Sequence, residues 1–121
     1  MNANRACILL AAVIALPACE KSPIQAKNRF IREFTEFIHE VERQSTHFTV
    51  DSDWYIYDSK RDDYKQLEYL EHVEVMSSVE RQQVNALLTR YNRAKGRYLA
   101  RRFNEKLDSF SATVKAFLST S

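Results

Sequence analysis

The residues that could take part in catalysis are three histidines and the carboxylates near them. Glu36 and His39 have the Glu-x-x-His spacing that supplies ligands in carboxylate-bridged di-iron bundles. Such a site needs a second copy of the motif and two further glutamates on facing helices, and the sequence contains no second copy. His39 also falls opposite the apolar face of its predicted helix. We therefore expect an exposed histidine here and not a metal ligand.

The other two histidines do not form a metal site by themselves. His47 lies at a predicted helix end and His72 follows Glu68 by four residues. The sequence also lacks a serine elbow, a glycine-rich phosphate loop and a zinc-binding histidine pair. We expect no enzymatic activity, no metal and no cofactor.

The start of the chain has the parts of a secretory signal. Arg5 precedes an apolar run from Ala6 to Leu16, and small residues follow. A run of about 11 residues is too short to cross a bilayer of about 30 Å, whereas it suits a signal peptide. We expect residues 1–18 to be removed.

The end of this run, Leu16-Pro17-Ala18-Cys19, resembles the lipobox of bacterial lipoproteins, although Pro17 departs from the commonest pattern. The resemblance implies cleavage before Cys19 and acylation of its sulfur and its new amino group. Two or more acyl chains anchor a protein firmly, whereas one chain binds only marginally. With Cys7 removed and Cys19 lipidated, the mature chain would have no free thiol and no disulfide. An ordinary signal peptide with a chance cysteine is the alternative.

The residue after Cys19 bears on the location. In the sorting rule of Gram-negative lipoproteins, Asp at this place favours the inner membrane, and here it is Glu20. The resemblance therefore implies an outer-membrane lipoprotein. No acidic cluster of the kind that directs some lipoproteins outward follows the cysteine, so we expect it to face the periplasm.

Composition predicts an all-α fold. The chain has one Gly and two Pro, which leaves few of the turns that sheets require. We expect a lipidated cysteine and short tether at residues 19–23 and a single domain at residues 24–121. That domain is predicted to be a three-helix bundle with a long C-terminal helix.

The first predicted helix has the clearest pattern. Ser22 and Pro23 form an N-cap followed by a proline in the first helical position. Apolar side chains at helical spacing form one face, which we expect to be a core face: Phe30, Ile31, Phe34, Phe37, Ile38 and Val41. The helix is expected to end near His47.

The second predicted helix, from about residue 53 to 75, is less regular. Its inward line is expected to contain Tyr57, Tyr64, Leu67 and Leu70. Three aromatic residues fall away from that line: Trp54, Tyr55 and Tyr69. They could line a binding surface, or Trp54 could cover one end of the bundle beside the turn at Phe48.

The third predicted helix begins at a capping box formed by Ser77 and Glu80, and it continues to about Leu118, for roughly 60 Å. Two apolar faces, displaced by roughly 130°, follow one another along it. The first face contains Val84, Leu87, Tyr91, Ala94 and Tyr98. The second face contains Phe103, Leu107, Phe110, Val114 and Phe117, and we call it the C-terminal seam.

Two folds of this last segment are compatible with the pattern. The chain could bend or break near Gly96, because Gly costs about 1 kcal/mol relative to Ala inside a helix, and fold back as a fourth helix. Alternatively, one continuous or mildly bent helix projects past the turn at Phe48 to Asp51 and leaves the C-terminal seam for another chain. The pattern favours the continuous helix.

Charge divides between the two halves. Residues 24–76 hold 7 basic and 12 acidic residues, and residues 77–121 hold 9 basic and 3 acidic residues. The acidic helices are expected to pack beside the basic one.

Four arginines share a stripe at helical spacing: Arg90, Arg93, Arg97 and Arg101. Basic and aromatic spacing can serve nucleic acids, but in an envelope protein anionic lipid headgroups or an acidic polysaccharide are the expected ligands, and no nucleic acid is expected.

Short motifs along the chain resemble those of uncharacterised helical lipoproteins of Gram-negative gut commensals, a domain of unknown function. They are Phe37-Ile38, Val41-Glu42, Phe48-Thr49, Asp53-Trp54, Asp58, Tyr64, the cap from Ser77 to Glu80, Leu88 and Gly96-Arg97-Tyr98. The resemblance covers about residues 30–103. This chain departs from it by an extra residue between Thr49 and Asp53. The resemblance implies a lipid-anchored three-helix bundle and carries over no catalytic residue.

Together these patterns predict a lipid-anchored, non-enzymatic interaction module of the cell envelope. It would dock an envelope protein or a copy of itself through the C-terminal seam. The alternative is a module that binds a glycan or another anionic ligand through Trp54, Tyr55, Tyr69 and the arginine stripe.

Overall fold

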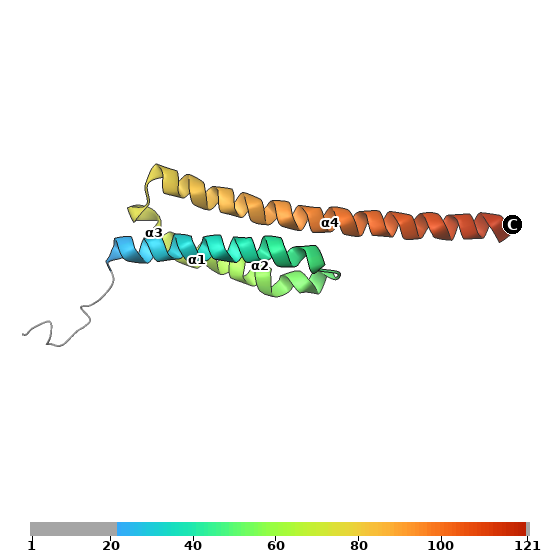
Figure 1. Ribbon diagram of the computed structural model, residues 1–121, viewed down its shortest axis with the longest axis horizontal. Helices are drawn as coiled ribbons and strands as arrows, with labels where there is room; N and C mark the ends of the chain where they lie inside the picture. Colours follow the sequence, from blue (N-terminus) through green and yellow to red (C-terminus); the bar gives the residue numbers. More distant parts are fainter. Residues whose placement is uncertain (1–21, 121) are drawn as a thin grey trace, which may run out of the picture.

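The computed structural model describes residues 22–120. The expected signal segment, residues 1–18, and the expected lipidation site, Cys19, lie outside the described residues. Within the described range every regular element is helical, which confirms the all-α prediction. The elements form a three-helix bundle with a long C-terminal helix (Figure 1).

The first helix, α1, spans Pro23–Gln44 and continues as a 3₁₀ turn at Ser45–His47. Its start is the predicted one, because the Ser22 hydroxyl accepts a hydrogen bond from the Gln25 backbone N–H and Pro23 follows the cap. The predicted apolar face is confirmed. Its members Phe30, Phe34, Phe37, Ile38 and Val41 are buried, and Ile31 packs beside them.

The second arm of the bundle is one helical segment with a change of pitch in its middle. It consists of a 3₁₀ turn at Asp51–Trp54, α2 at Tyr55–Asp62, a π-helical segment at Asp63–Glu68, α3 at Tyr69–His72 and a 3₁₀ turn at Val73–Val75. It runs beside α1 (Figure 1). The side chain of Asp53 begins it by accepting hydrogen bonds from the backbone N–H groups of Thr49 and Val50.

The predicted inward line of this arm is half right. Tyr57 and Tyr64 pack against the core, but Leu67 and Leu70 are exposed. A π-helical segment adds residues to a turn and so rotates every later side chain relative to an α-helix. Tyr69 therefore packs against the core where the α-helical pattern had placed Leu67 and Leu70.

The third arm, α4, is a single helix of 43 residues, Ser78–Thr120. The predicted capping box is present, since Glu80 accepts from the Ser77 backbone N–H at 2.9 Å and donates its own N–H to the Ser77 hydroxyl at 3.1 Å. Glu80 also binds the buried Lys27 of α1, with 2.7 Å between Nζ and Oε2. The same carboxylate thus starts α4 and ties it to α1.

The core lies between the three arms and is rich in aromatic rings. The predicted first face of α4 is confirmed, because Val84, Leu87, Tyr91, Ala94 and Tyr98 are all buried. The rings of Phe34 and Tyr64 stack with centroids 4.9 Å apart, and Tyr91 meets Phe37 at 6.2 Å. One aromatic layer therefore joins all three arms.

The alternative of a fourth helix that folds back at Gly96 is wrong. Gly96 lies within α4, and contacts on either side hold it there: Lys95 binds Asp58 at 2.6 Å, and the Tyr98 hydroxyl donates to Asp51 at 2.8 Å. The intrinsic cost of one glycine, about 1 kcal/mol, is too small to break a helix anchored this way. As a result α4 extends well beyond the ends of α1 and α2 (Figure 1).

Replacing Gly96 by Ala is expected to raise the free energy of unfolding by about 1 kcal/mol, because Ala restricts the unfolded chain more and favours the helix. A Cβ at Gly96 would meet no atom within 4 Å, so no clash offsets the gain. Urea unfolding followed by far-ultraviolet circular dichroism measures it. Ala86→Gly, at an exposed site of the same helix, should lose a similar amount. An unchanged or lowered midpoint for Gly96→Ala would contradict a helical Gly96.

Candidate functional site

The C-terminal seam lies on the part of α4 that projects beyond the other two arms (Figure 1). Its five side chains are exposed over much of their surface: Phe103 61%, Leu107 48%, Phe110 67%, Val114 37% and Phe117 70%. Within the described residues no other element packs on them, since the bundle core contains none of the five. The structure thus leaves an apolar face without a partner, and such faces mark interaction sites.

The position of the seam follows from where the bundle ends. The buried face of α4 finishes at Tyr98, and the next residue in its register is Arg101. The Arg101 guanidinium donates to the carbonyl oxygen of Phe48 at 2.8 Å and packs over the Tyr98 ring. Arg101 therefore closes the bundle over the turn after α1, and the seam begins two residues later.

The side chains of the seam recur at steps of four and three residues, which is the spacing of a coiled-coil contact line. In the seven-residue repeat of a coiled coil, the three phenylalanines occupy the d positions, and Leu107 and Val114 occupy the a positions. The same spacing reaches back to Ala100, which is exposed and lies three residues before Phe103. Ala100 was not among the residues predicted for this line, although extending the repeat backwards identifies it.

The projecting segment carries little charge. Residues 103–120 contain two acidic and two basic residues: Glu105, Lys106, Asp108 and Lys115. Glu105 is paired with Arg102 at 3.1 Å. A contact on the seam would therefore bury few charges, which keeps the desolvation penalty of docking small.

The arginine stripe is partly used inside the molecule. Arg90 forms a two-point ion pair with Glu42 of α1, at 2.9 Å and 2.6 Å. This hydrogen bond, more than any other interaction, lowers the pKa of Glu42 below its usual value. Arg101 binds the turn, whereas Arg93 and Arg97 are exposed. The expected attraction between acidic and basic arms is thus realised by specific pairs.

Of the two roles considered for Trp54, the cover at one end of the bundle beside the turn at Phe48 is confirmed, and the role in a binding surface is wrong. Its indole is 1% exposed and lies edge-on to Phe48, Tyr91 and Tyr98, with ring centroids 5.1 to 5.8 Å apart. The 3₁₀ turn that precedes α2 gives Trp54 a direction that a straight α-helix from residue 53 would not. Tyr69 is half-buried, and only Tyr55 of the three is largely exposed. The three aromatics therefore do not form one surface.

A polar cluster at the buried side of α4 was not predicted. The Tyr91 hydroxyl donates to Asp58 Oδ1 at 2.5 Å, and Lys95 donates to Asp58 Oδ2 at 2.6 Å. Burial, and then the bond to Asp58, raises the pKa of Tyr91. Each of these residues has an ordinary place in its helix, so no spacing in the sequence marks the cluster. It ties α2 to α4 and touches no cavity described here.

The candidate catalytic residues remain scattered. His39 is exposed, as expected, and His72 packs its ring against Phe30 with centroids 5.3 Å apart. Over residues 22–120 no group of three or more His, Cys, Asp or Glu side chains is placed to hold a metal ion. None of the helices in this range is long and apolar enough to cross a membrane.

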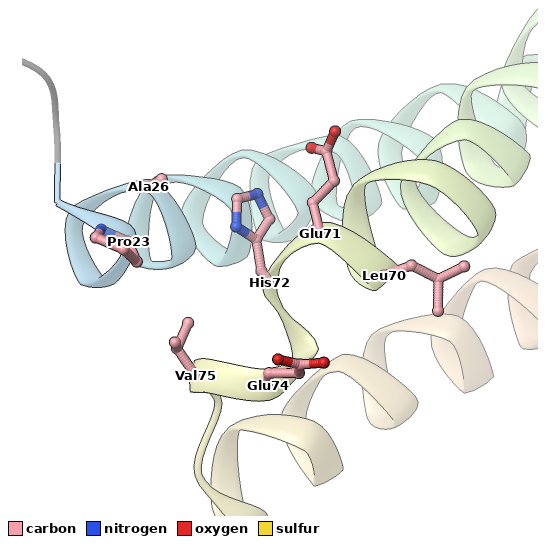
Figure 2. A pocket seen from close by; sticks show the side chains of 7 residues that line it. All are labelled: Pro23, Ala26, Leu70, Glu71, His72, Glu74 and Val75. Atoms are coloured by element: carbon pink, nitrogen blue, oxygen red, sulfur yellow. The ribbon is translucent and has the colours of Figure 1, made fainter.

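A hollow of about 420 Å³ lies where α1 begins and the second arm ends. Its lining comprises Pro23, Ala26, Leu70, Glu71, His72, Glu74 and Val75. Figure 2 shows His72 turned toward α1 and the carboxylates of Glu71 and Glu74 pointing in different directions. These polar groups do not converge on one point, so the hollow lacks the convergent donors and acceptors of a typical ligand site.

Comparisons with protein-family models, with curated proteins and with solved structures found no match. The resemblance to helical lipoproteins therefore stays a prediction, and the seam is the feature of the described chain on which a function can be argued.

Proposed function

We propose that this chain is a lipid-anchored, non-enzymatic interaction module of the bacterial envelope that docks a helical protein surface through the C-terminal seam. The observation that carries the proposal is the exposure of the five seam side chains on a helix that extends beyond its own bundle. Large apolar side chains in a contiguous line are rarely left in water unless they bind something.

The bundle does not need the seam for its own stability, which supports a separate role for it. The core contains residues from Phe30 to Tyr98, and among the described residues the last side-chain hydrogen bonds from α4 to another part of the bundle are those of Tyr98 and Arg101. About five helical turns follow, and they carry three phenylalanines. Such a segment would be an unstable extension unless a partner covered its apolar side.

The envelope location rests on the sequence of the first 19 residues, with the lipobox-like Leu16 to Cys19. Three residues separate Cys19 from the start of α1 at Pro23, so an anchored bundle would sit close to the lipid. The outer membrane and its periplasmic face are part of the proposal. In this setting the partner would be another envelope protein or a second copy.

The experiment places a photo-crosslinking amino acid at single sites of the full chain in living bacteria that process lipoproteins. We expect crosslinked products from Phe103 and Phe110 and none from Ala112 and Ser119, which lie on the opposite side of the same helix. Equal products from both sides, or none from either, would overturn docking through the seam.

The same cells test the anchor. The full chain should be found in the membrane fraction and take up labelled fatty acid, and Cys19→Ala should abolish both. Cys7→Ala is the matched control, because Cys7 belongs to the segment expected to be removed, and it should leave both unchanged. Fatty-acid labelling that survives Cys19→Ala would overturn the assigned anchor.

A further inference from the structure

We infer that the partner of the C-terminal seam is a second copy of this chain, with the two α4 helices antiparallel. The inference rests on the proposed docking function and names its occupant. It follows from the order of large and small side chains along the seam, from the charges that flank it and from the area it exposes.

Together with Ala100, which continues its spacing, the C-terminal seam alternates between two kinds of position. In coiled-coil terms, Phe103, Phe110 and Phe117 occupy the d positions, and Ala100, Leu107 and Val114 occupy the a positions. Every d residue is thus a phenylalanine, and every a residue is smaller. All six side chains are exposed.

In an antiparallel pair, each a residue faces a d residue of the other helix. With the two-fold axis between Asp108 and Ser109, the facing pairs are Ala100 with Phe117, Phe103 with Val114, and Leu107 with Phe110, each occurring twice. Every layer then contains one phenylalanine and one smaller residue. Layers of similar volume keep the helices at one separation along the whole contact, which close packing requires.

In a parallel pair each a residue would face an a residue and each d residue a d residue. Layers of two phenylalanines would then alternate with layers of two smaller residues, and no single distance between the helices would pack both kinds of layer closely. The a positions also continue toward the bundle, and the one before Ala100 is Arg93, which is exposed and takes part in no ion pair described here. A parallel pair would place Arg93 against its own copy, whereas in the antiparallel pair Arg93 lies outside the contact that Ala100 to Phe117 form.

The flanks of an antiparallel seam bring no like charges together. Asn104 would face Ser111 of the other copy, and Lys106 would face Thr113. The bundles do not collide, because the seam is turned by roughly 130° from the side of α4 that packs on α1. The N-terminal ends of the two α4 helices would then lie about 90 Å apart. This makes an elongated dimer that can lie along a lipid surface with an anchor at each end.

The exposed area is sufficient for a specific dimer. At about 200 Å² for each phenylalanine, side chains that are about two-thirds exposed offer on the order of 400 Å² per copy. Two copies would bury on the order of 800 Å² from phenylalanine alone, and the a residues bring the total near the 1,000 Å² or so that a specific interface needs.

The test uses the chain from Glu20 to Ser121, which holds every described core contact and no cysteine. Asn104→Cys and Ser111→Cys chains are prepared separately, mixed and treated with a short bis-maleimide linker. An antiparallel seam brings these two positions together, so we expect a mixed crosslinked dimer, identified by intact mass. The control mixture is Lys106→Cys with Ser111→Cys, which only a parallel seam would bring together, and we expect little product from it.

Sedimentation equilibrium of the same chain is expected to show a dimer. Phe110→Glu should weaken the dimer by on the order of 100-fold or more, because each substitution places two charges in the contact. The matched control, Ala112→Glu, adds the same charge to the opposite side of α4 and should leave the dimer unchanged. Far-ultraviolet circular dichroism verifies that both variants keep the bundle.

The outcomes separate this inference from the proposed function. Crosslinking of the control mixture in place of the first would overturn the antiparallel order and leave docking through the seam intact. A monomer at every concentration, with photo-crosslinks from Phe103 and Phe110 to a different protein in cells, would overturn the second copy as partner. A monomer with no photo-crosslink from the seam would overturn both.

Discussion

Replacing Trp54 by Ala is expected to abolish cooperative unfolding of the bundle at neutral pH. The Trp54 indole is almost fully buried at the end where α1, the second arm and α4 meet, and three aromatic rings contact it edge-on. Removing a buried aromatic side chain of this size costs about 3–5 kcal/mol, since the cavity cannot close. That loss is comparable with the whole stability of a small bundle. Urea titration followed by circular dichroism at 222 nm would show it.

Tyr55→Ala provides the matched control. Tyr55 is the next residue along the chain, but it is 69% exposed, so its loss should change the free energy of unfolding by no more than about 0.5 kcal/mol. Equal midpoints for Trp54→Ala and the native chain would show that the burial of Trp54 does not stabilise the bundle. A loss of stability in Tyr55→Ala as large as that in Trp54→Ala would show that the loss does not depend on the burial of the side chain.

Replacing Asp58 by Ala is expected to lower the free energy of unfolding by about 2–3 kcal/mol, because the fully buried Tyr91 hydroxyl and the Lys95 ammonium group lose their acceptor. Asp58→Asn keeps an oxygen for Tyr91 and removes only the charge, so it should cost less, about 1–2 kcal/mol. Urea unfolding at pH 7 measures both. An Asp58→Ala chain as stable as the native chain would contradict this arrangement.

The same carboxylate makes stability depend on pH. Burial would raise the pKa of Asp58, but the hydrogen bonds from Lys95 and Tyr91 outweigh it and hold the pKa below its ordinary value of 3.8. A carboxylate with a lowered pKa in the folded state stabilises the protein above its ordinary pKa and loses that contribution as the pH falls through the folded value. We therefore expect stability to decrease below about pH 4, and to decrease less steeply in Asp58→Asn.

Asp63→Asn is the control for charge alone. Asp63 lies in the same arm and is exposed, and no ion pair described here involves it. The Asp63→Asn chain should therefore retain the acid dependence of the native chain. If Asp58→Asn and the native chain lose stability in parallel from pH 5 to pH 3, the acid dependence does not come from the Asp58 cluster.

Local patterns predicted much of the fold correctly. The start of α1, its buried face and the capping box of α4 depend on residues within a few positions of one another. The two faces of α4 follow from helical periodicity, which is visible in the spacing of apolar residues along the sequence. The caps could be predicted because their hydrogen bonds come from neighbours along the chain, and the faces because helical periodicity decides which side chains share one side of a helix.

The second arm could not be predicted to the same degree. Its π-helical segment turns Tyr64 and Tyr69 toward the core, and their packing on the other arms stabilises the segment. The direction of Trp54 depends on a 3₁₀ turn that matches the turn at Phe48. Tertiary packing selects both the π-helical segment and the 3₁₀ turn, because it overrides a weak local preference for the α-helix.

The sequence by itself determined that the chain is helical, where its first and last helices begin and that the long helix carries a second apolar face. Only the tertiary structure decided which aromatic residues are buried and which charged residues form ion pairs, because burial and pairing depend on distances between separate arms. It buried Trp54 and paired Arg90 and Asp58, and it left the C-terminal seam exposed, since the other two arms end before the seam begins.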